Sequence, residues 1–487
     1  MTAAHRFPTL SELVPGLSAP WANAVPVDLT LDSREVVENA VFLAIPGHQN
    51  DGRDHIEAAL AAGALAVLAE REGYATDGNA RVIPVSDLRL RVGDLARQFY
   101  GDPSASMSLC AVTGTNGKTS IVDFIAQLSS ALDYPAATLG TLGAQRAGHT
   151  ESTRNTTPDV LTTNRYLRRW LDQGVQSIAL EASSHALVQD RLSGLSIRTA
   201  IFANLTRDHL DYHDDLQDYA DAKLALFRRQ ELEFALYNAD CPWAAQVGDV
   251  AQCQKAGLTL QGATTDCQVT ILSRYPALEL ELVTPWGSGR VTCQLSGDFN
   301  AFNVSAAIIT LAQWGSDWPS ILRAASTLRS VSGRMEQIDN DRGIRAVVDY
   351  AHTPDALRAA LMALRPQTPG ALWVIFGCGG NRDRGKRAEM GRFAEQLADH
   401  VVVTSDNPRN ESPEAILDDI CGGLRDPATR LVDRREAIEW AVARAAAGDS
   451  ILVAGKGHEE YQEVEGIRQP FSDRDVLRRA LALGGAA

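Results

Sequence analysis

The sequence predicts an α/β protein of three domains, and three observations support that prediction. The 487 residues are about three times an ordinary domain length of roughly 150 residues. Apolar strands alternate with helical stretches along most of the chain, a pattern typical of largely parallel, doubly wound sheets. Turn-forming residues at 101–104 and a restart of the alternation near Gly333 divide the chain. We therefore expect a small α/β domain (1–103), a central doubly wound domain (104–332) and a C-terminal Rossmann-like α/β domain (333–487).

The elements follow in order. In the first domain we expect strands at 41–45, 64–69 and 81–85, a helix that begins near Asp54 and a second helix at 90–100. The longest apolar run, 58–69, is too short to span a bilayer. By itself it suggests a packed Ala-rich helix, although it overlaps one of these strands. In the central domain, strands are expected at 108–114, 177–182 and 197–204, with antiparallel strands over 269–291. Strands of the third domain, at 344–352, 371–380, 400–406 and 450–457, end in small or polar residues, where an open sheet places its ligands.

Composition excludes several classes of protein. Lys and Arg number 46 against 61 Asp and Glu, which gives a net charge of −15 and argues against nucleic acid or an anionic membrane as a partner. The seven cysteines are odd in number and form no CxxC pair, so neither a disulfide framework nor a zinc site is predicted. The N-terminus lacks the pattern of a signal peptide. We expect a monomer in the cytoplasm without membrane insertion, although no sequence pattern addresses the oligomeric state.

A glycine loop gives the first chemical signal. Gly114-Thr115-Asn116-Gly117-Lys118-Thr119-Ser120 follows an apolar strand and precedes a helix with Ile121, Ile125, Leu128 and Leu132 on one face. Backbone N–H groups of such a loop bind phosphate at a helix N-terminus, a lysine contacts the outer phosphates, and a threonine hydroxyl can coordinate Mg²⁺. The loop predicts a P-loop ATPase-like central domain that binds phosphate groups. Its glycine spacing is two residues tighter than GxxxxGK[ST], and the alternative is an ordinary glycine turn.

This loop resembles the GTNGKT[ST] loop of the Mur ligase family, the ATP-dependent amide-forming enzymes of peptidoglycan assembly. The segments EASSH and NLTRDHLDYH resemble further family motifs, and the resemblance implies that Glu181 and His209 bind Mg²⁺. From the residues alone, Glu181 could instead cap a helix, and His209 could be structural. The resemblance implies two Mg²⁺ sites, with Thr119, Glu181, His209 and Lys223 as ligands, and a catalytic set of Lys118, Glu181, His209 and Lys223.

Lys223 also stands out on physical grounds. It shares a helical face with Tyr219, Leu226 and Phe227, so its amine is predicted to lie on an apolar stripe. Burial would lower the amine's pKa and leave it able to react with CO₂, whereas a snorkelling side chain would stay charged. In similar ligases the matching lysine is carbamylated, so Lys223 is the expected modified residue.

Other walls of the nucleotide site are implied by the same resemblance. Asn300, at the start of an apolar helix, is expected to contact the nucleotide, with Asn303 close by, although both could be simple caps. Arg334 is expected to meet phosphate. Asp349, in the strand-end motif that also contains His352, is expected to meet the ribose.

Two clusters are expected to bind a UDP-N-acetylmuramoyl-L-Ala-D-Glu substrate. In the first domain the resemblance implies Leu31, Ser33, His48, Gln49 and Asn50. In the central domain it implies Asn155, Thr156, Thr157, Ser183, Gln189 and Arg191. The segment TTPD also reads as a helix N-terminus with Pro at the first helical position. Asn39-Ala40 replaces the family's usual Gly-Asp, which is tolerable because Asn can adopt a left-handed turn.

The third domain carries the motif that indicates the second substrate. TSDNPRNE resembles the DNPR motif of the relatives that add meso-diaminopimelate, and Arg409 can bind its extra carboxylate bidentately. Other expected contacts are Arg382, Asp406, Asn407, Pro408, Gly455 and Glu459. Alternatively, SDNPR is only an Asx-Pro turn. We discount a dinucleotide site at CGGNRDRGKR, which lacks the GxGxxG spacing.

The resemblance thus implies an ATP-dependent ligase that joins diaminopimelate to the D-Glu γ-carboxylate through an acyl phosphate. A lysine-adding ligase and a folylpolyglutamate synthetase are the alternatives within the enzyme class. A P-loop ATP switch protein is the alternative from another class. No residue identifies itself as the base that deprotonates the attacking amine.

Overall fold

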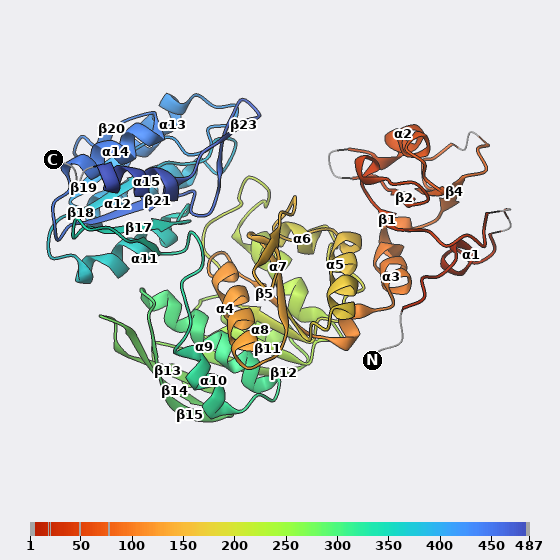
Figure 1. Cartoon of the computed structure of the whole chain (residues 1–487), viewed down its shortest axis with the longest axis horizontal. Coiled ribbons are helices and arrows are strands. Elements are labelled where there is room, and N and C mark those ends of the chain that lie inside the picture. The colour runs from red at the N-terminus through yellow and green to blue at the C-terminus, as the bar shows by residue number, and fades with distance from the viewer. Residues whose placement is uncertain (1–4, 18, 20, 48–49, 76–77, 484–487) are drawn as a thin grey trace. The chain divides into compact units, whose positions relative to one another are not determined.

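The computed structural model describes residues 5–17, 19, 21–47, 50–75 and 78–483. It divides into two compact units, each treated by itself. The first unit contains residues 1–111, 133–199 and 230–233, and the second contains 112–132, 200–229 and 234–487. Two strands, β5 (Ser108–Thr113) and β10 (Thr199–Phe202), have residues in both units. Figure 1 labels the elements along the chain.

The first unit begins with a parallel four-stranded sheet in the order β1-β2-β3-β4. Apolar residues on its two faces form two small cores with the helices α2 and α3. Its elements are α1 (Leu10–Leu13), β1 (Leu29–Thr30), β2 (Val41–Ala44), α2 (Ile56–Ala61), β3 (Ala66–Glu70), β4 (Val82–Val85) and α3 (Leu88–Tyr100). The expected strands and helices are confirmed, as is the left-handed turn at Asn39, whose φ is +65°.

The expectation of one helix over 58–69 is wrong. Helix α2 ends at Ala61, Gly63 follows with φ +97°, and the chain then enters the buried strand β3. An apolar run suits a buried strand as well as a buried helix. The glycine ends the helix, because a left-handed backbone costs it no Cβ clash.

The rest of the first unit belongs to the central part of the chain. Strands β6 and β9 are parallel, and β7 and β8 extend this sheet antiparallel to β6, in the order β9-β6-β7-β8. The elements are β6 (Ala136–Gly140), β7 (Gly143–Arg146), β8 (His149–Glu151), α5 (Val160–Asp172), β9 (Ser177–Glu181) and α6 (Ser184–Val188). Asp159, not a threonine, caps α5, so Pro158 precedes the cap and the expectation of Pro at the first helical position is wrong.

The second unit opens with the helix after the glycine loop. The expected antiparallel strands over 269–291 are confirmed as the β13-β14-β15 meander beside the parallel pair β11-β12. The elements are α4 (Lys118–Ala131), α7 (Leu216–Leu224), β11 (Phe234–Asn238), α8 (Ala244–Val250), β12 (Gln254–Thr259), β13 (Cys267–Ser273), β14 (Leu278–Thr284), β15 (Gly287–Cys293), α9 (Asp298–Gln313) and α10 (Trp318–Ala325).

The remainder of the second unit is a six-stranded sheet in the order β16-β17-β21-β18-β19-β20, parallel except for β16. Two separate cores show that its helices pack on both faces, α11 to α13 on one and α14 and α15 on the other. The elements are β16 (Glu336–Ile338), β17 (Arg345–Asp349), α11 (Pro354–Leu364), β18 (Leu372–Phe376), α12 (Gly385–Leu397), β19 (His400–Val403), α13 (Pro413–Cys421), β20 (Thr429–Arg430), α14 (Arg434–Arg444), β21 (Ser450–Ala454), the hairpin β22 (Tyr461–Val464) and β23 (Ile467–Pro470), and α15 (Asp473–Leu483). This doubly wound arrangement confirms the predicted fold class.

Candidate functional site: a phosphate loop and an amino-acid cleft

The glycine loop joins β5 to α4 as the sequence predicts. Gly117 stands at the N-cap of α4 with φ +88°, and no side chain caps that helix end. Lys118 folds back over the loop, its Nζ donating to the carbonyls of Gly114 at 2.8 Å and Thr115 at 2.9 Å. Uncapped backbone N–H groups at the positive end of a helix, beside an ammonium group, form a binding place for phosphate.

Asn204, at the end of β10, holds this loop and is absent from the predicted site. Its Oδ1 accepts from the backbone N–H of Asn116 at 2.9 Å, and its Nδ2 donates to the Asn116 carbonyl at 3.0 Å. The hydroxyl of Thr115 accepts from the backbone of Thr206 at 3.0 Å. The sequence feature that could have identified Asn204 is its position at the end of an apolar strand.

Lys223 is buried beside the loop, as predicted. Its side chain is 1% exposed, which excludes the snorkelling alternative. Its Nζ donates to the Gly114 carbonyl at 3.0 Å and lies 4.3 Å from the ring centre of Tyr219. Burial lowers the pKa of the amine well below its ordinary value, and the charge of Lys118 lowers it further, against the attraction of Asp208.

His209 lies in the loop after β10 with a left-handed backbone, φ +55°. Its Nε2 is 3.5 Å from a carboxylate oxygen of Asp208. Asp208 is buried, with 5% of its surface exposed. Burial alone would raise the pKa of Asp208, but His352, His209 and Lys386 around it hold the pKa well below its ordinary value. A buried, ionised carboxylate therefore stands next to the predicted metal ligand.

Glu181 belongs to the first unit, where it ends β9. Its two carboxylate oxygens accept from the backbone N–H and the hydroxyl of Thr141, at 2.8 and 3.1 Å. Ser183 caps α6, so the alternative of Glu181 as a helix cap is wrong. Of the four predicted metal ligands, Thr119, His209 and Lys223 belong to the second unit. Among the described residues, no three His, Cys, Asp or Glu side chains group as a metal site.

The predicted muramoyl-dipeptide residues of the central region gather in the first unit. Arg191 donates to the Thr157 carbonyl at 3.0 Å and to Gln189 Oε1 at 2.6 and 3.1 Å. Thr157 in turn donates to the Ser183 hydroxyl at 3.2 Å, while Thr156 accepts from Thr141 at 3.3 Å.

Arg154, next to the predicted Asn155, pairs with the short helix that follows β1. Its guanidinium pairs with Asp32, and with Glu35 at 3.3 Å. Asp32 caps the short helix that starts at Ser33, a predicted contact residue. The other predicted residues here lie on loops: Leu31 is half-buried, and Asn50 and Asn155 are exposed. His48 and Gln49 lie outside the described residues.

Arg334 reaches the phosphate loop within the second unit. Its Nη2 donates to the Thr119 hydroxyl at 3.0 Å, and its guanidinium carbon lies 4.2 Å from the ring centre of Tyr350. Its Nη1 is buried without a hydrogen-bond partner among the described residues. A buried N–H group left without an acceptor is costly, so this guanidinium is arranged to receive an anion.

Two further predicted residues, Asp349 and Asn300, lie in the same region, with Asn303 beside the second. Asp349 is buried and accepts from the backbone N–H of Met335 at 2.7 Å; burial raises its pKa, while Arg334 acts in the other direction. Asn300 donates to the Ser296 carbonyl at 2.8 Å and accepts from Asn303 at 3.1 Å. Gly297 is the N-cap of α9, so neither asparagine is the cap that the alternative expected.

The predicted amino-acid residues meet at the carboxyl ends of β19 and β21. Lys456, fully buried, lies at their centre: its Nζ is 2.8 Å from Asn407 Oδ1, 3.1 Å from Glu459 and 3.5 Å from Asp406. Asn407 also donates to Glu459 at 2.8 Å. The sequence prediction missed Lys456, although it stands between Gly455 and Glu459 in the same motif.

Two guanidinium groups border this cluster at Gly379. Arg409 donates to the Gly380 carbonyl at 2.9 Å. A Cβ on Gly379 would lie 2.9 Å from Arg409 Nη1, so the missing side chain gives that guanidinium its room, while Arg382 Cγ, at 3.7 Å, would be at ordinary contact distance. Pro408 is buried between Asn407 and Arg409. Two cations thus stand beside carboxylates and an amide, which suits a zwitterionic ligand with a second carboxylate.

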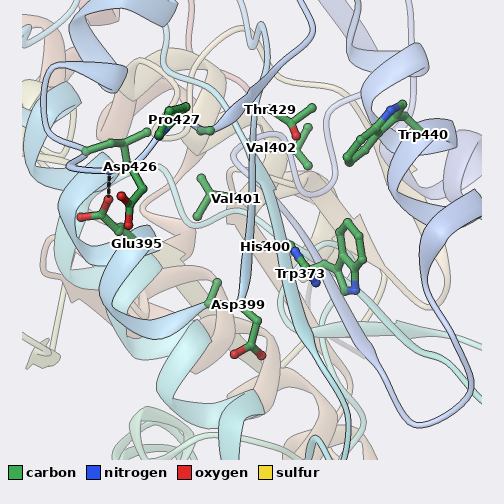
Figure 2. Close-up of a pocket in the computed structure, with 13 residues that line it drawn as sticks. Trp373, Glu395, Asp399, His400, Val401, Val402, Asp426, Pro427, Thr429 and Trp440 are labelled. Carbon is green, nitrogen blue, oxygen red and sulfur yellow. Dashed lines mark hydrogen bonds between the residues drawn. The ribbon is translucent and has the colours of Figure 1, made fainter.

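A separate cavity of about 250 Å³ lies at the opposite ends of β18, β19 and β20. Figure 2 shows Trp373 beside His400, with Trp440 nearby; the first two rings are 3.9 Å apart between centres. No predicted site residue lines this cavity. No helix among the described residues is long and apolar enough to cross a membrane.

A phosphate loop at a strand end, with a lysine and an arginine directed at it, defines a P-loop nucleotide-binding protein. Three family descriptions match consecutive parts of the chain: "Mur ligase family, catalytic domain" over residues 28–100, "Mur ligase middle domain" over 112–311 and "Mur ligase, glutamate ligase domain" over 333–457.

Curated relatives and solved structures agree. The UDP-N-acetylmuramoyl-L-alanyl-D-glutamate--2,6-diaminopimelate ligases of Neisseria meningitidis serogroup A and Pseudomonas aeruginosa are 42% and 43% identical over 478 and 462 residues. These alignments cover 96% and 93% of this chain and 97% and 95% of the relatives. A solved structure of a ligase with the same name matches with a TM-score of 0.71 at 37% identity, covering 99% of this chain and 100% of the other. The chain belongs to the Mur ligase family.

Proposed function

We propose that this protein is an ATP-dependent ligase that adds meso-diaminopimelate to the D-Glu γ-carboxylate of UDP-N-acetylmuramoyl-L-Ala-D-Glu, a step of peptidoglycan precursor synthesis. The observation that carries the proposal is the pair of arginines at Gly379 beside the Asp406–Asn407–Glu459 cluster, in the same unit as the phosphate loop. The relatives described above bear the name of a diaminopimelate ligase and are similar over nearly the whole chain.

The phosphate loop supports the first half-reaction. Loop N–H groups and Lys118 bind the phosphates of ATP, and Arg334, with its unsatisfied Nη1, takes an outer phosphate. The γ-carboxylate of D-Glu attacks the γ-phosphorus and the bond to ADP breaks, which leaves an acyl phosphate and ADP. These cations spread the charge that develops on the transferred group.

Asn300 and Asp349 complete the nucleotide site in this proposal. Asp349, buried beside Arg334, is the expected ribose contact, and Asn300, with Asn303, lines the wall next to Gly117. Neither assignment is needed for the reaction class, but both are needed for ATP to be held in one orientation.

Two Mg²⁺ ions are the expected cofactors. Mg²⁺ is usually held by one or two protein oxygens together with substrate phosphates, so a site with few carboxylates suits it. Thr119, Glu181, His209 and the carbamate of Lys223 are the proposed ligands. Burial lowers the pKa of the Lys223 amine well below its ordinary value, which favours the neutral form that reacts with CO₂ and so fits that modification. When bound, the ions neutralise charge on the phosphates.

The amino-acid cleft supports the second half-reaction. The distal carboxylate of diaminopimelate pairs with Arg409 and Arg382, and its distal ammonium with Asp406 and Glu459. The other amine attacks the acyl phosphate carbon, phosphate leaves, and an amide bond remains. L-Lysine lacks the distal carboxylate, so the two guanidinium groups would be left without their partner.

The first unit supplies the UDP-sugar peptide site in this proposal. Thr157, Ser183, Gln189 and Arg191 form one hydrogen-bonded cluster, and Arg154, next to Asn155 in sequence, pairs with Glu35 of the helix at Ser33. Leu31, Asn50, Asn155 and Thr156 are the further contacts. His48 and Gln49 remain proposed on the sequence motif alone. The seven free cysteines support our assignment of the reaction to the reducing cytoplasm.

The test is ADP release by the full chain with Mg²⁺ and ATP. The proposed ligase releases ADP at an appreciable rate only when both UDP-N-acetylmuramoyl-L-Ala-D-Glu and meso-diaminopimelate are present. Replacement by L-lysine should lower kcat/KM by at least about 10³-fold, because buried polar groups are left unpaired. Equal rates with L-lysine would favour a lysine-adding ligase. ADP release indifferent to both substrates would favour a P-loop switch.

A further inference from the structure

Two loop segments of the second unit carry an unusual density of opposite charges. The 207–211 segment follows β10 and contains the predicted metal ligand His209. The 382–386 segment begins α12 and contains the predicted diaminopimelate contact Arg382. None of the other charged residues of these segments has a part in the proposed chemistry.

Three ion pairs join the two segments. Arg207 binds Asp383 in a fork, with Nε and Nη2 at 2.8 and 3.2 Å from its two carboxylate oxygens. Asp208 lies 3.5 Å from Lys386 Nζ, and Asp211 lies 3.4 Å from Arg382 Nη1. The polarity of the pairs is mixed, because the 207–211 segment supplies the cation in the first pair and the anion in the other two. Such a pattern fits only one register of the two segments.

The middle pair is the buried one. The side chains of Asp208 and Lys386 are 7% and 6% exposed, and His352 approaches the same carboxylate at 3.6 Å. Breaking a buried pair leaves an uncompensated charge, so this contact holds the two segments together more firmly than a surface pair does. Arg207 is about half exposed, but its partner Asp383 is only 7% exposed.

Gly385 makes the forked pair possible. A Cβ at this position would lie 2.3 Å from Arg207 Nη2, so any other residue would push the guanidinium away from the start of α12. Asp383 also accepts from the backbone N–H of Gly385 at 2.8 Å. One carboxylate therefore anchors the helix end and receives Arg207 at the same place.

We propose that the 207–211 and 382–386 segments form an ionic latch that positions His209 and Arg382 relative to each other, and so couples the nucleotide site to the amino-acid cleft. This inference rests on the proposed ligase function. Arg207, Asp208, Asp383 and Lys386 are positioning residues that touch no substrate. When the latch is broken, ATP still binds to its loop, but diaminopimelate meets a displaced Arg382.

Charge exchange at the exposed end of the latch tests the proposal. In the ADP-release assay, Arg207→Asp should raise the KM for diaminopimelate about fivefold, the upper range for a half-exposed pair, while the Kd for ATP from calorimetry stays within about twofold. The double variant Arg207→Asp/Asp383→Arg restores the charge pair but removes the acceptor of the Gly385 N–H, so it should recover part of the loss of Arg207→Asp. Asp383→Asn keeps an acceptor for Gly385 and removes only the charge, so it should resemble Arg207→Asp.

The control is Arg290→Glu, which breaks an exposed pair with Glu281 at 2.9 Å within the β14–β15 hairpin and should leave both constants unchanged. Raising the salt from about 0.05 M to about 0.5 M should raise the KM for diaminopimelate more in the wild type than in Arg207→Gln/Asp383→Asn.

The latch is overturned if Arg207→Asp behaves like the wild type, or if the double variant shows the sum of the single losses. A uniform fall in thermal stability with parallel loss of ATP binding would also overturn it, since that result indicates a purely structural pair. The proposed ligase function fails separately, if the wild type itself releases ADP without regard to diaminopimelate.

Discussion

Replacing Lys223 by methionine should remove a pH dependence of stability that the wild type carries. The Lys223 amine is 1% exposed, and its only hydrogen bond among the described residues goes to the Gly114 carbonyl at 3.0 Å. As an ammonium it would leave two N–H groups unsatisfied in an apolar setting, so the folded protein favours the neutral amine. Methionine has a similar shape and no titratable group.

The sign follows from proton linkage. An unfolded lysine titrates near pH 10.4, and the folded pKa of Lys223 is lower. Between the two pKa values the unfolded chain binds more protons than the folded protein, so stability rises with pH in that window. It stops changing below the folded pKa. The limiting slope for one proton is about 1.4 kcal/mol per pH unit.

The measurement is urea unfolding in CO₂-free buffer at several pH values from about 7 to about 9.5, below the unfolded lysine pKa. The unfolding free energy of the wild type minus that of Lys223→Met should increase with pH. The slope of this difference should approach about 1.4 kcal/mol per pH unit. Lys118→Met removes the cation whose charge lowers the Lys223 pKa, so its profile should be less steep than that of the wild type. Identical profiles for wild type and Lys223→Met would refute the reasoning.

Added bicarbonate extends the same test to the modification. Near pH 8 the neutral amine attacks the carbon of CO₂ and loses a proton, which leaves a carbamate. Native intact mass should then show one added CO₂ in the wild type and none in Lys223→Met. Absence of the adduct from the wild type would remove the carbamate from the proposed metal ligands.

Three further predictions concern single positions. Arg409→Ala should raise the KM for diaminopimelate roughly 10- to 150-fold, the equivalent of about 1.5–3 kcal/mol for a hydrogen bond to a charged group. The Kd for ATP, measured by calorimetry, should not change. A selective loss of ATP binding would contradict the role of Arg409. Gly117→Ala should weaken ATP binding at least about tenfold, while the melting temperature falls only slightly. The reason is that the new Cβ would lie 2.8 Å from Asn303 Oδ1, on a backbone with φ +88°. Wild-type affinity would show that the loop tolerates a side chain. Asp473→Asn should lower the unfolding free energy by about 3–5 kcal/mol in urea titrations, because it leaves Arg434 buried without its carboxylate partner. A loss below about 1 kcal/mol would mean that solvent reaches the pair.

Motifs that are continuous in sequence could be predicted because the chain alone brings their residues together. The loop from Gly114 to Ser120 needs only one strand and one helix to acquire its shape. Strand ends of a parallel sheet lie at one edge, so Asp349, Asn407 and Gly455 could be placed from the apolar pattern before them. The burial of Lys223 followed from its helical face.

Contacts between distant segments could not be predicted in this way. Arg207 and Asp383 are 176 residues apart, and Asn204 is 88 residues from the Asn116 that it holds. No local pattern marks such pairs, because each residue by itself resembles any polar residue in a loop. The prediction of a helix over 58–69 was wrong for a different reason. The composition of this run suits a strand and a helix equally, and only Gly63 decides between them.

The net charge of −15 is unfavourable for binding the anionic substrates proposed here. An acidic protein repels anions at long range, so anionic substrates require cations that local carboxylates do not already neutralise. Arg334 and Arg409 meet this condition: among the described residues neither forms an ion pair, and each donates to a neutral oxygen, of Thr119 and of Gly380. Arg207, by contrast, is neutralised by Asp383 and is poorly suited to receive an anion. Arg382 belongs to neither group alone, because it pairs with Asp211 at 3.4 Å and is also a proposed diaminopimelate contact. The partner of each arginine, rather than the total charge, therefore distinguishes Arg334 and Arg409 from Arg207.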